Sequence, residues 1–370
     1  MKNTKIIVRT KSESYPIYFG DEILKSTAAL IKKNISKVKK ICIVSDSNLP
    51  SSLLKKLTIS LKKYNPKIYK FPATEKTKSF KIANKLIENI LKDNLNRSDC
   101  IIAFGGGILG DLAAFVTSLT KRGIKFVNIP TTLLAQVDAS IGGKTAINSP
   151  QGKNLIGTFY QPNFVLIDIS LLKNLPHREM VCGYGEILKH SLILDRKFFF
   201  WLSKNAKKII NNKNKKFLKS AIIQSCKIKS KIISSDEKED NLRKILNFGH
   251  TFAHGFEGAK KFSRRLSHGE AVLLGMMVAC ELAHKKKLLD TKELILIKKH
   301  YINLNLPMNI KEIFKKKDID KIISFMEKDK KNLNEKINLV LIKRIGKTLK
   351  PNSVYIDRNE LKKFLLSNYI

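Results

Sequence analysis

Two histidines, His250 and His254, lie four residues apart in the stretch NFGHTFAHGFEG. Four residues is close to one helical turn, so on a helix both imidazoles would lie on the same face. The stretch resembles the zinc-protease pattern HExxH, but Thr251 stands where that pattern has its glutamate. A zinc-protease site is therefore excluded, and a metal pair, an acid–base pair and two packed histidines remain open.

Further candidate metal ligands lie in the same half of the chain. Three of the seven histidines fall between residues 250 and 268, and His268 directly precedes a glycine in SHGEA. Glu186, in GYGEILKH, adds a carboxylate. One carboxylate and two histidines with an open position form the ligand pattern of catalytic zinc. The residues alone also allow histidines that are merely satisfied polar groups.

Phosphate binding is indicated by GGGILGD at residues 105–111, between the apolar run DCIIAFG and the helical pattern DLAAFVTSL. Gly105, Gly107 and Gly110 have GxGxxG spacing. Glycines let the backbone approach a pyrophosphate, and the following helix offers N–H groups at its N-terminus. No acidic residue ends the next strand, so Asp46, at the end of an earlier one, is the candidate ribose partner. We expect a nucleotide site of a variant kind, with a purely structural tight turn as the alternative.

A polar segment, PTTLLAQVDASIGGKTAIN at residues 130–148, follows the next apolar run. Gly142 and Gly143 directly precede Lys144, so the GxxxxGK[ST] spacing of a P-loop is absent. Lys144 and Asn154 offer a cation and amide donors to an anionic ligand. The alternative is a solvated loop in a lysine-rich chain.

The formal net charge of +40 makes a polyanion a candidate partner. The lysines are spread over almost every segment, however, and the sequence has neither zinc-finger cysteine spacing nor an RNP-like aromatic motif. This distribution is typical of a compositional bias along the whole chain. We therefore expect no specific nucleic-acid partner, although the charge can help to attract an anionic substrate.

The N-terminal residues do not have the pattern of a signal peptide, and no run approaches the roughly 20 apolar residues of a membrane span. The longest apolar run, residues 271–283, is typical of a buried helix. The five cysteines are scattered and form neither a CxxC pair nor a disulfide framework. These features predict a cytoplasmic protein without a membrane partner.

The pattern of apolar residues changes once along the chain. Before about residue 176, apolar strand-like runs alternate with amphipathic helical patterns, which predicts a doubly wound, Rossmann-like parallel sheet. From residue 177 the patterns are helical, with one possible strand at residues 337–346. The predicted fold is α/β, with an N-terminal domain 1–176 and a mainly α-helical domain 177–370. The predicted strands are residues 39–46, 67–73, 99–107, 125–132 and 163–169, and the clearest early helix is 78–95.

These motifs together resemble the 3-dehydroquinate synthase family. The resemblance runs from GGGILGD through IPTTLLAQVDASIGGKTAIN, LPHREMVCGYGEILKH, LRKILNFGHTFAH and SHGEAV to DKK, in the same order over nearly the whole chain. It implies a phosphorus–oxygen lyase that depends on NAD and on one zinc or cobalt ion per subunit, and it implies a homodimer. The first domain would bind NAD, and the second would bind the metal and substrate.

The resemblance also implies an activity in the shikimate pathway of aromatic amino acid and chorismate biosynthesis. Its second step converts 3-deoxy-D-arabino-heptulosonate 7-phosphate to 3-dehydroquinate and phosphate. NAD would oxidise the substrate transiently, phosphate would leave, and the hydride would return before ring opening and intramolecular aldol closure. In this family the substrate's own phosphate would take the proton, so few protein bases would be required.

The resemblance assigns site residues by position. The metal ligands would be Glu186, His250 and His268, while His254 would handle protons or support the site. The catalytic and substrate-contacting residues would be Arg122, Asp138, Lys144, Asn154, Lys189, Lys229, Arg243, Asn247, His254 and Lys331. The NAD site would include Asp46, Glu75, Lys78, Gly106, Gly107, Leu109, Asp111, Thr131, Thr132, Leu134, Asp138, Lys144 and Lys153.

Three alternatives remain open at this level. A related sugar phosphate cyclase, such as a 2-deoxy-scyllo-inosose synthase, would share fold and cofactors, but Arg243 and the intact LRKILNFGH favour a substrate with a carboxylate. A glycerol-dehydrogenase-like enzyme would release NADH and need fewer phosphate-binding cations. A nucleic-acid-binding protein would show strong, salt-dependent retention on DNA.

Overall fold

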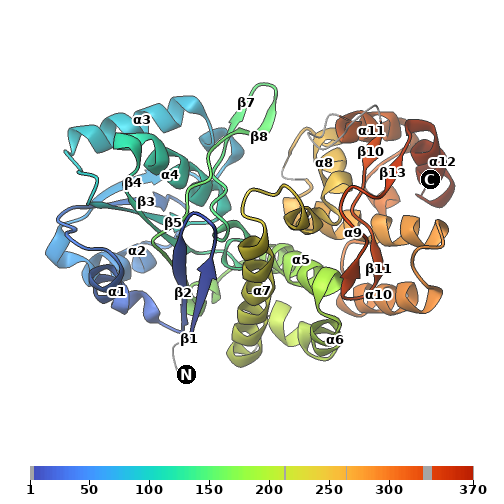
Figure 1. Ribbon diagram of the computed structural model, residues 1–370, viewed down its shortest axis with the longest axis horizontal. Coiled ribbons are helices and arrows are strands. Elements are labelled where there is room, and N and C mark those ends of the chain that lie inside the picture. The colour runs from blue at the N-terminus through green and yellow to red at the C-terminus, as the bar shows by residue number, and fades with distance from the viewer. Residues whose placement is uncertain (1–3, 212–213, 264, 328–335, 370) are drawn as a thin grey trace. The chain divides into compact units, whose positions relative to one another are not determined.

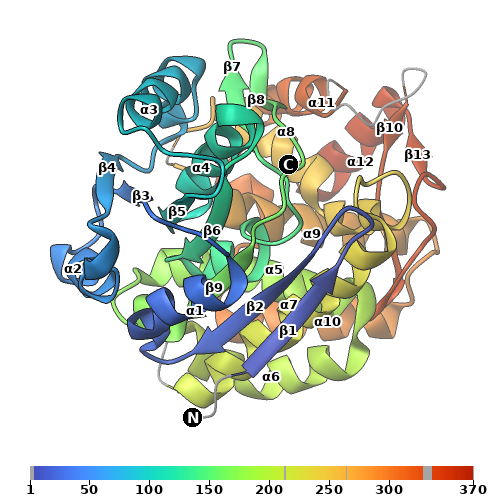
Figure 2. The same cartoon turned by 60° about the vertical axis from the view of Figure 1, so that its left-hand side comes forward.

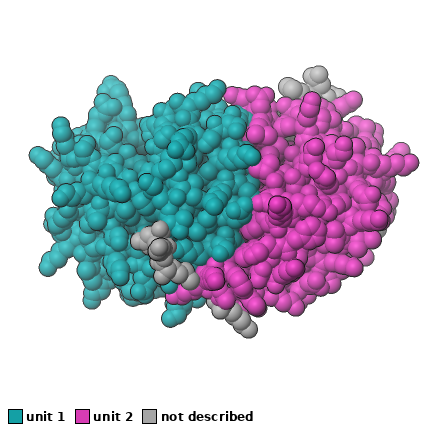
Figure 3. Space-filling model, turned by 60° about the horizontal axis from the view of Figure 1, so that its bottom comes forward, with its two compact units in different colours: residues 1–176, 218–238 teal, residues 177–217, 239–370 magenta. Residues whose placement is uncertain are grey.

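The computed structural model describes residues 4–211, 214–263, 265–327 and 336–369. The chain divides into two compact units, coloured separately in Figure 3. Unit 1 holds residues 1–176 and 218–238, and unit 2 holds residues 177–217 and 239–370. The sequence predicts a single division after residue 176. In the structure the segment 218–238, most of helix α7 (Lys215–Ser235), belongs to unit 1.

Unit 1 is built on a seven-stranded sheet with the order β1-β2-β9-β6-β5-β3-β4 (Figure 1). Neighbouring strands are parallel except β1 and β2, which form an antiparallel hairpin at one edge, visible in Figure 2. The predicted parallel α/β sheet is confirmed, and the hairpin is an addition to it. The strands are β1 (Thr4–Arg9), β2 (Ser14–Gly20), β3 (Ile41–Asp46), β4 (Lys67–Phe71), β5 (Cys100–Gly105), β6 (Lys125–Pro130) and β9 (Phe164–Asp168).

The sheet is covered on both faces, which explains why its strands are continuous apolar runs. Along β3, Ile41 and Ile43 join the core on one face, and Cys42 and Val44 join the core on the other. Helices α1 (Thr27–Asn34) and α2 (Ser51–Ser60) pack on the first face, while α3 (Phe80–Lys92) and α4 (Gly107–Leu119) pack on the second (Figure 1). A separate hairpin, β7 (Ile147–Ser149) and β8 (Gly152–Ile156), follows β6.

Unit 2 is mainly helical, as predicted. Its described residues include two small antiparallel β-pairs, β10 with β13 and β11 with β12, and β10 and β11 take the place of the single strand expected at residues 337–346. The helices are α5 (His177–Leu194), α6 (Arg196–Ile210), α8 (His250–Ala259), α9 (His268–Lys285), α10 (Thr291–Leu304), α11 (Ile319–Glu327) and α12 (Arg358–Tyr369). The strands are β10 (Ile337–Asn338), β11 (Ile342–Arg344), β12 (Lys347–Thr348) and β13 (Tyr355–Ile356).

Helix α9 is the centre of unit 2, and the prediction that its apolar run forms a buried helix is confirmed. Two glycines let other elements approach it closely. A Cβ at Gly269 would overlap the Cα of Cys182 on α5, and a Cβ at Gly275 would overlap the carbonyl oxygen of Gly249 just before α8. The starts of α8 and α9 and the middle of α5 are therefore held together. Among the described residues, no helix is both long and apolar enough to cross a membrane.

Candidate active site

The three predicted metal ligands converge in unit 2. Glu186 lies in α5, while His250 and His268 are the first residues of α8 and α9. Their ligand atoms all lie within 4.8 Å of one another, and His250 Nε2 is 3.7 Å from Glu186 Oε1. Gly249, just before α8, has φ +80°, a left-handed conformation that glycine adopts without strain. The sequence thus places both imidazoles at helix starts beside a buried carboxylate.

Both histidine rings are oriented by oxygen acceptors. His250 Nδ1 lies 3.3 Å from the carbonyl oxygen of Phe248, and His268 Nδ1 lies 3.1 Å from Oε2 of Glu257. These contacts favour a proton on Nδ1 and leave Nε2 of each ring as the ligand atom. Two imidazole nitrogens and one carboxylate oxygen suit zinc or cobalt at a catalytic site with an open position. The donor set therefore fits the metal that the resemblance implies, and its role stays a prediction.

Two further predicted residues lie beside this cluster. Lys189 forms an ion pair with Glu186 one helical turn earlier, and the side chains are only 1% and 0% exposed. Buried lysines are rare without a partner, so this pairing accounts for the burial. The ring of His254 is 5.9 Å from that of His250, on the next turn of α8. His250 and His254, which the sequence alone did not distinguish, therefore differ in position: His250 belongs to the ligand cluster, and His254 lies beside it.

The start of α9 is fixed by a network around Glu270. Glu270 and Ser267 form a capping box, which holds the first turn that carries His268. Arg178, in the first turn of α5, donates to both carboxylate oxygens of Glu270, at 2.7 and 2.6 Å, and to the carbonyl of Arg265 at 3.1 Å. This bidentate pair ties the beginning of α5 to the beginning of α9.

The remaining predicted residues of unit 2 lie before α8 or outside the described residues. Arg243 is buried, and Asn247 donates to Glu239 at 2.5 Å; both stand in the short helical segment Leu242–Asn247. This segment leads into His250, so its geometry is coupled to the metal cluster. Lys331 lies outside the residues that the structure describes.

In unit 1 the glycine loop lies at the carboxyl ends of the parallel strands. Gly106 precedes α4, and a Cβ there would be 3.2 Å from Thr132 Cγ2; a Cβ at Gly105 would be 3.6 Å from Cβ of Asp46. Thr131 N donates to the Gly105 carbonyl at 3.0 Å, which joins the ends of β5 and β6. This cradle, next to the N–H groups that begin α4, fits a dinucleotide pyrophosphate.

Lys78 contacts two other predicted site residues. Its Nζ lies 2.5 Å from Asp111 Oδ2 and 2.5 Å from Asn154 Oδ1. Burial raises the pKa of the Asp111 carboxyl more than the neighbouring Lys78 lowers it. Lys78 is itself buried, so the contact is shielded from water.

Glu75 forms a second polar cluster next to the first. Its carboxylate accepts from Asn148 at 2.8 Å and lies 3.1 Å from Lys153 Nζ. Burial alone would raise the pKa of Glu75, but Lys153, Asn148 and Lys78 together lower it. A pocket of about 400 Å³ opens beside these residues, large enough for part of a nucleotide. It is lined by Glu75, Lys76, Lys78, Ser79, Phe80, Lys81, Asn148, Ser149 and Pro150.

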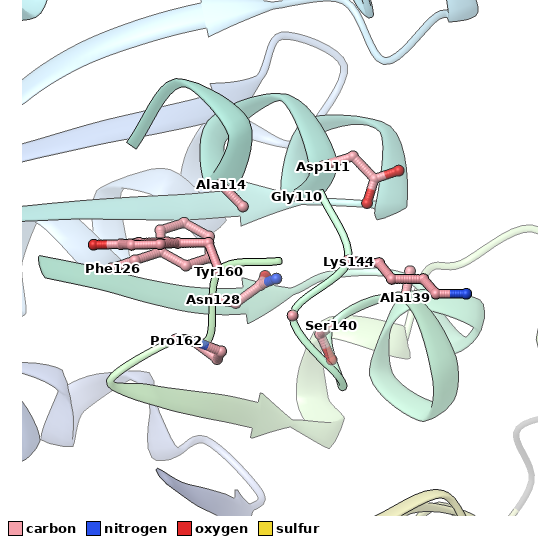
Figure 4. Close-up of a pocket in the computed structure, with 11 residues that line it drawn as sticks. Gly110, Asp111, Ala114, Phe126, Asn128, Ala139, Ser140, Lys144, Tyr160 and Pro162 are labelled. Atoms are coloured by element: carbon pink, nitrogen blue, oxygen red, sulfur yellow. The ribbon is translucent and has the colours of Figure 1, made fainter. Parts of the chain in front are cut away.

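The loop from Thr131 to Lys144 carries further residues of the predicted NAD site. Leu134 is half-buried, and Asp138 lies in the short helical turn Ala135–Ala139, where Lys229 of α7 contacts it. Lys144 is exposed and lines a cavity of about 10 Å³, room for about one water molecule. Figure 4 shows Asp111 on α4, Asn128 on β6 and Lys144 on the loop around this cavity. The described parts of the predicted NAD set, including the buried Leu109, therefore lie in unit 1.

Arg122, predicted as a substrate contact, lies beyond the end of α4 that is opposite the glycine loop. It is exposed, with φ +60°, just after α4, whereas Gly106 and Gly107 begin that helix. A helix of 13 residues spans about 20 Å at about 1.5 Å per residue. Within one chain, the structure does not bring Arg122 to the glycine loop.

Sequence reasoning missed several residues that hold the predicted ones. Asn148 contacts both Glu75 and the backbone N–H of Asn154, and Tyr15 on β2 accepts from Gly142 N at 3.0 Å, just before Lys144. Nothing local in the sequence indicates either contact. Glu257 did leave a signal, since it stands seven residues, or about two helical turns, after His250 and therefore on the same face.

Models of one known family match both halves of the chain. The family model for the N-terminal part of 3-dehydroquinate synthase matches residues 68–182, and the model for its C-terminal part matches residues 183–332. A 3-dehydroquinate synthase from Pelagibacter ubique is 52% identical over 342 residues, which are 92% of this chain and 93% of that protein. The resemblance seen in the motifs is confirmed.

Two solved structures of sugar phosphate cyclases have a similar fold. A 2-deoxy-scyllo-inosose synthase complexed with carbaglucose-6-phosphate, NAD+ and Co2+ is 26% identical, with a TM-score of 0.88 over 99% of this chain and 100% of that chain. A 2-epi-5-epi-valiolone synthase from Streptomyces hygroscopicus, with NAD+ and Zn2+ bound, is 26% identical, with a TM-score of 0.84 over 96% and 97% of the two chains.

Proposed function

Because the chain belongs to the 3-dehydroquinate synthase family, we propose that it converts 3-deoxy-D-arabino-heptulosonate 7-phosphate to 3-dehydroquinate and phosphate. This is a phosphorus–oxygen lyase reaction of the shikimate pathway that depends on NAD and a divalent metal ion. The observation that carries the proposal is the convergence of Glu186, His250 and His268 in a chain that matches the family over most of its length.

The cofactors supply the chemistry that side chains lack: NAD takes and returns a hydride, and a zinc or cobalt ion lowers the pKa of the substrate hydroxyls that it binds. Unit 1 would hold NAD, with the pyrophosphate at Gly106 and Gly107 and the ribose near Asp46. Glu75 and Lys153 would bind the adenosine end at the pocket beside them.

In unit 2, Glu186 and Nε2 of His250 and His268 would hold the metal. The remaining polar residues would bind and orient the substrate. In unit 1 these are Lys144, Asn154, Asp138 and Lys229; in unit 2 they are Lys189, Arg243, Asn247 and His254. Half of these eight residues are lysine or arginine, which suits a substrate with a phosphate and a carboxylate. His254, near the metal cluster but not part of it, would hold or move a proton.

The direct test is phosphate release from the heptulosonate phosphate by purified protein with NAD and Zn2+ or Co2+. It should be run beside a chelator-treated sample, a His268→Ala variant and glucose 6-phosphate as an alternative substrate. We expect metal-dependent phosphate release with no net NADH, no release by His268→Ala, and no release from glucose 6-phosphate.

Other outcomes identify the rivals. NADH that accumulates without phosphate would indicate a dehydrogenase, and phosphate release from glucose 6-phosphate alone would indicate a different sugar phosphate cyclase. A homodimer in the cytoplasm is also part of the proposal. The dimer is what the resemblance to the family implies, and sedimentation of the purified protein tests it.

A further inference from the structure

Glu257 is a buried carboxylate that faces the ring of His268, a predicted metal ligand. Its side chain is 6% exposed, and Oε2 lies 3.1 Å from Nδ1 of His268. A buried carboxylate is costly unless it is paired or hydrogen-bonded. One partner of Glu257 is Nδ1 of His268, the ring nitrogen that is not the proposed ligand atom.

Helix α8 presents this carboxylate and a direct ligand on one face. His250 and Glu257 are seven residues apart, about two turns of a helix. The rings of His250 and His268 lie 5.4 Å apart, centroid to centroid. One face of α8 therefore contributes to the ligand cluster in two ways. His250 is itself a proposed ligand, and Glu257 contacts the proposed ligand His268.

In both His250 and His268, Nδ1 faces an oxygen acceptor, but the two acceptors differ. Nδ1 of His250 faces a backbone carbonyl, which is fixed by the chain, whereas Nδ1 of His268 faces a side chain. The other carboxylate near the start of α9, Glu270, is already occupied by Arg178 and by Ser267 N. Glu257 is thus the described carboxylate that orients His268.

We propose that Glu257 is a positioning residue for the metal: it accepts a hydrogen bond from Nδ1–H of His268, keeps Nε2 directed at the ion, and makes that nitrogen a stronger ligand. Carboxylates behind metal-bound histidines act in this way and change metal affinity about 10- to 100-fold. This inference rests on the proposed function, because it presupposes a metal at Glu186, His250 and His268.

The test is metal affinity, measured by competition with a chromophoric chelator for Zn2+ and by the visible absorption spectrum of bound Co2+. The variants are Glu257→Gln, which keeps an acceptor but loses the charge, and Glu257→Leu, which loses both. Metal binding should weaken in the order unmodified, Gln, Leu, within about 10- to 100-fold, and the Co2+ spectrum should change.

The matched control is Glu293→Gln. Glu293 is also a mostly buried carboxylate of unit 2, paired with Arg196 at 2.7 Å, but it lies outside the ligand cluster. It should lower stability without changing metal affinity. Circular dichroism checks that the variants fold. If Glu257→Leu does not fold, Glu257→Gln alone still tests the proposal.

A Glu186→Ala variant separates the two levels of the proposal. If Glu186→Ala abolishes binding while both Glu257 variants bind like the unmodified protein, the role of Glu257 is overturned and the metal site stands. If the unmodified protein binds no metal, or Glu186→Ala has no effect, the proposed metal site fails and the inference fails with it.

Discussion

Lys229 donates to both the backbone carbonyl and the carboxylate of Asp138, each at 2.6 Å, although 91 residues separate them. The contact fastens α7 to the loop that ends at Lys144. The Lys229 side chain is 7% exposed and that of Asp138 is 26% exposed, so water screens the pair only partly. With the contacts of Cys226 with Gln136 and of Glu237 with Gln161, this pair joins residues 218–238 to unit 1, although they lie in the second half of the chain.

Lys229→Met should therefore loosen unit 1 as well as the proposed site. Loss of the ammonium leaves the carbonyl and carboxylate of Asp138 without this donor, and we expect a loss of about 1–3 kcal/mol in the free energy of unfolding. We also expect kcat/KM to fall at least about tenfold, or about 1.4 kcal/mol. Urea unfolding and steady-state kinetics measure both effects. Lys227→Met, on the same helix but exposed, is the control, and an equal loss there would contradict this reading.

Lys78→Met tests the nucleotide side of the proposal. Without this lysine, Asp111 and Asn154 lose their common partner, and the Asp111 carboxyl, whose pKa burial already raises, has one cation fewer nearby. We expect the Kd for NAD, measured by calorimetry, to rise at least about tenfold because a charged hydrogen bond of about 1.5–3 kcal/mol is lost. Lys85→Met removes the same charge from an exposed position of α3 and should leave the Kd unchanged.

Local sequence patterns were enough to predict the strands and helices whose apolar residues repeat regularly. Apolar runs entering polar or glycine residues predict the strands that end at Asp46 and Gly105, and the family motifs bring Glu186, His250 and His268 together. Helix α7 shows the limit. Its apolar and lysine spacing resembles that of the helices of unit 2, and only tertiary contacts, such as those of Lys229 with Asp138 and of Cys226 with Gln136, place it in unit 1.

The same limit applies to the supporting residues of the site. Asn148 and Tyr15 act through contacts with residues distant in the sequence, 73 and 127 positions away. The apolar run INLVLIKRIG predicts one strand, yet it forms the short β10 and β11, because each pairs with a different later segment. Partner choice over such distances is set by tertiary packing, not by periodicity.

His300 should make unit 2 sensitive to mild acid. Ser203 donates to the Phe199 carbonyl, so its oxygen accepts from His300 Nδ1–H, and Tyr184 donates to Nε2. The ring is therefore neutral, and burial lowers its pKa from 6.5 to about 4. Between these values the unfolded chain binds the extra proton, so stability is complete above pH 6.5 and falls as pH decreases toward 4.

The size of this effect follows from the shift. The difference between 6.5 and about 4, at about 1.4 kcal/mol per unit, gives a loss of about 3 kcal/mol. His300→Gln cannot take up this proton, so the free energy of unfolding should depend less steeply on pH between 6.5 and 4.5. Urea unfolding at several pH values measures the two slopes, and parallel slopes would count against a neutral buried His300.

Gly269→Ala and Gly185→Ala form a matched pair at the crossing of α5 and α9. A Cβ at Gly185 would lie 3.2 Å from Leu273 Cγ and 3.3 Å from the Gly269 carbonyl oxygen, which small shifts can relieve. Alanine also gains about 1 kcal/mol of helix propensity over glycine, so Gly185→Ala should be close to neutral. A Cβ at Gly269 instead overlaps Cα, Cβ and the carbonyl oxygen of Cys182, mostly backbone atoms that cannot rotate away.

Gly269→Ala must therefore separate the two helices, at a cost of about 1–3 kcal/mol for overpacking. Because His268 directly precedes this glycine and Glu186 lies one turn beyond Cys182 on α5, the separation moves two proposed ligands apart. We expect Co2+ affinity to fall at least about tenfold, since about 1.4 kcal/mol corresponds to one decade, while Gly185→Ala binds Co2+ as the unmodified protein does. If Gly269→Ala lost stability but kept its Co2+ affinity, the ligand geometry would not depend on this crossing.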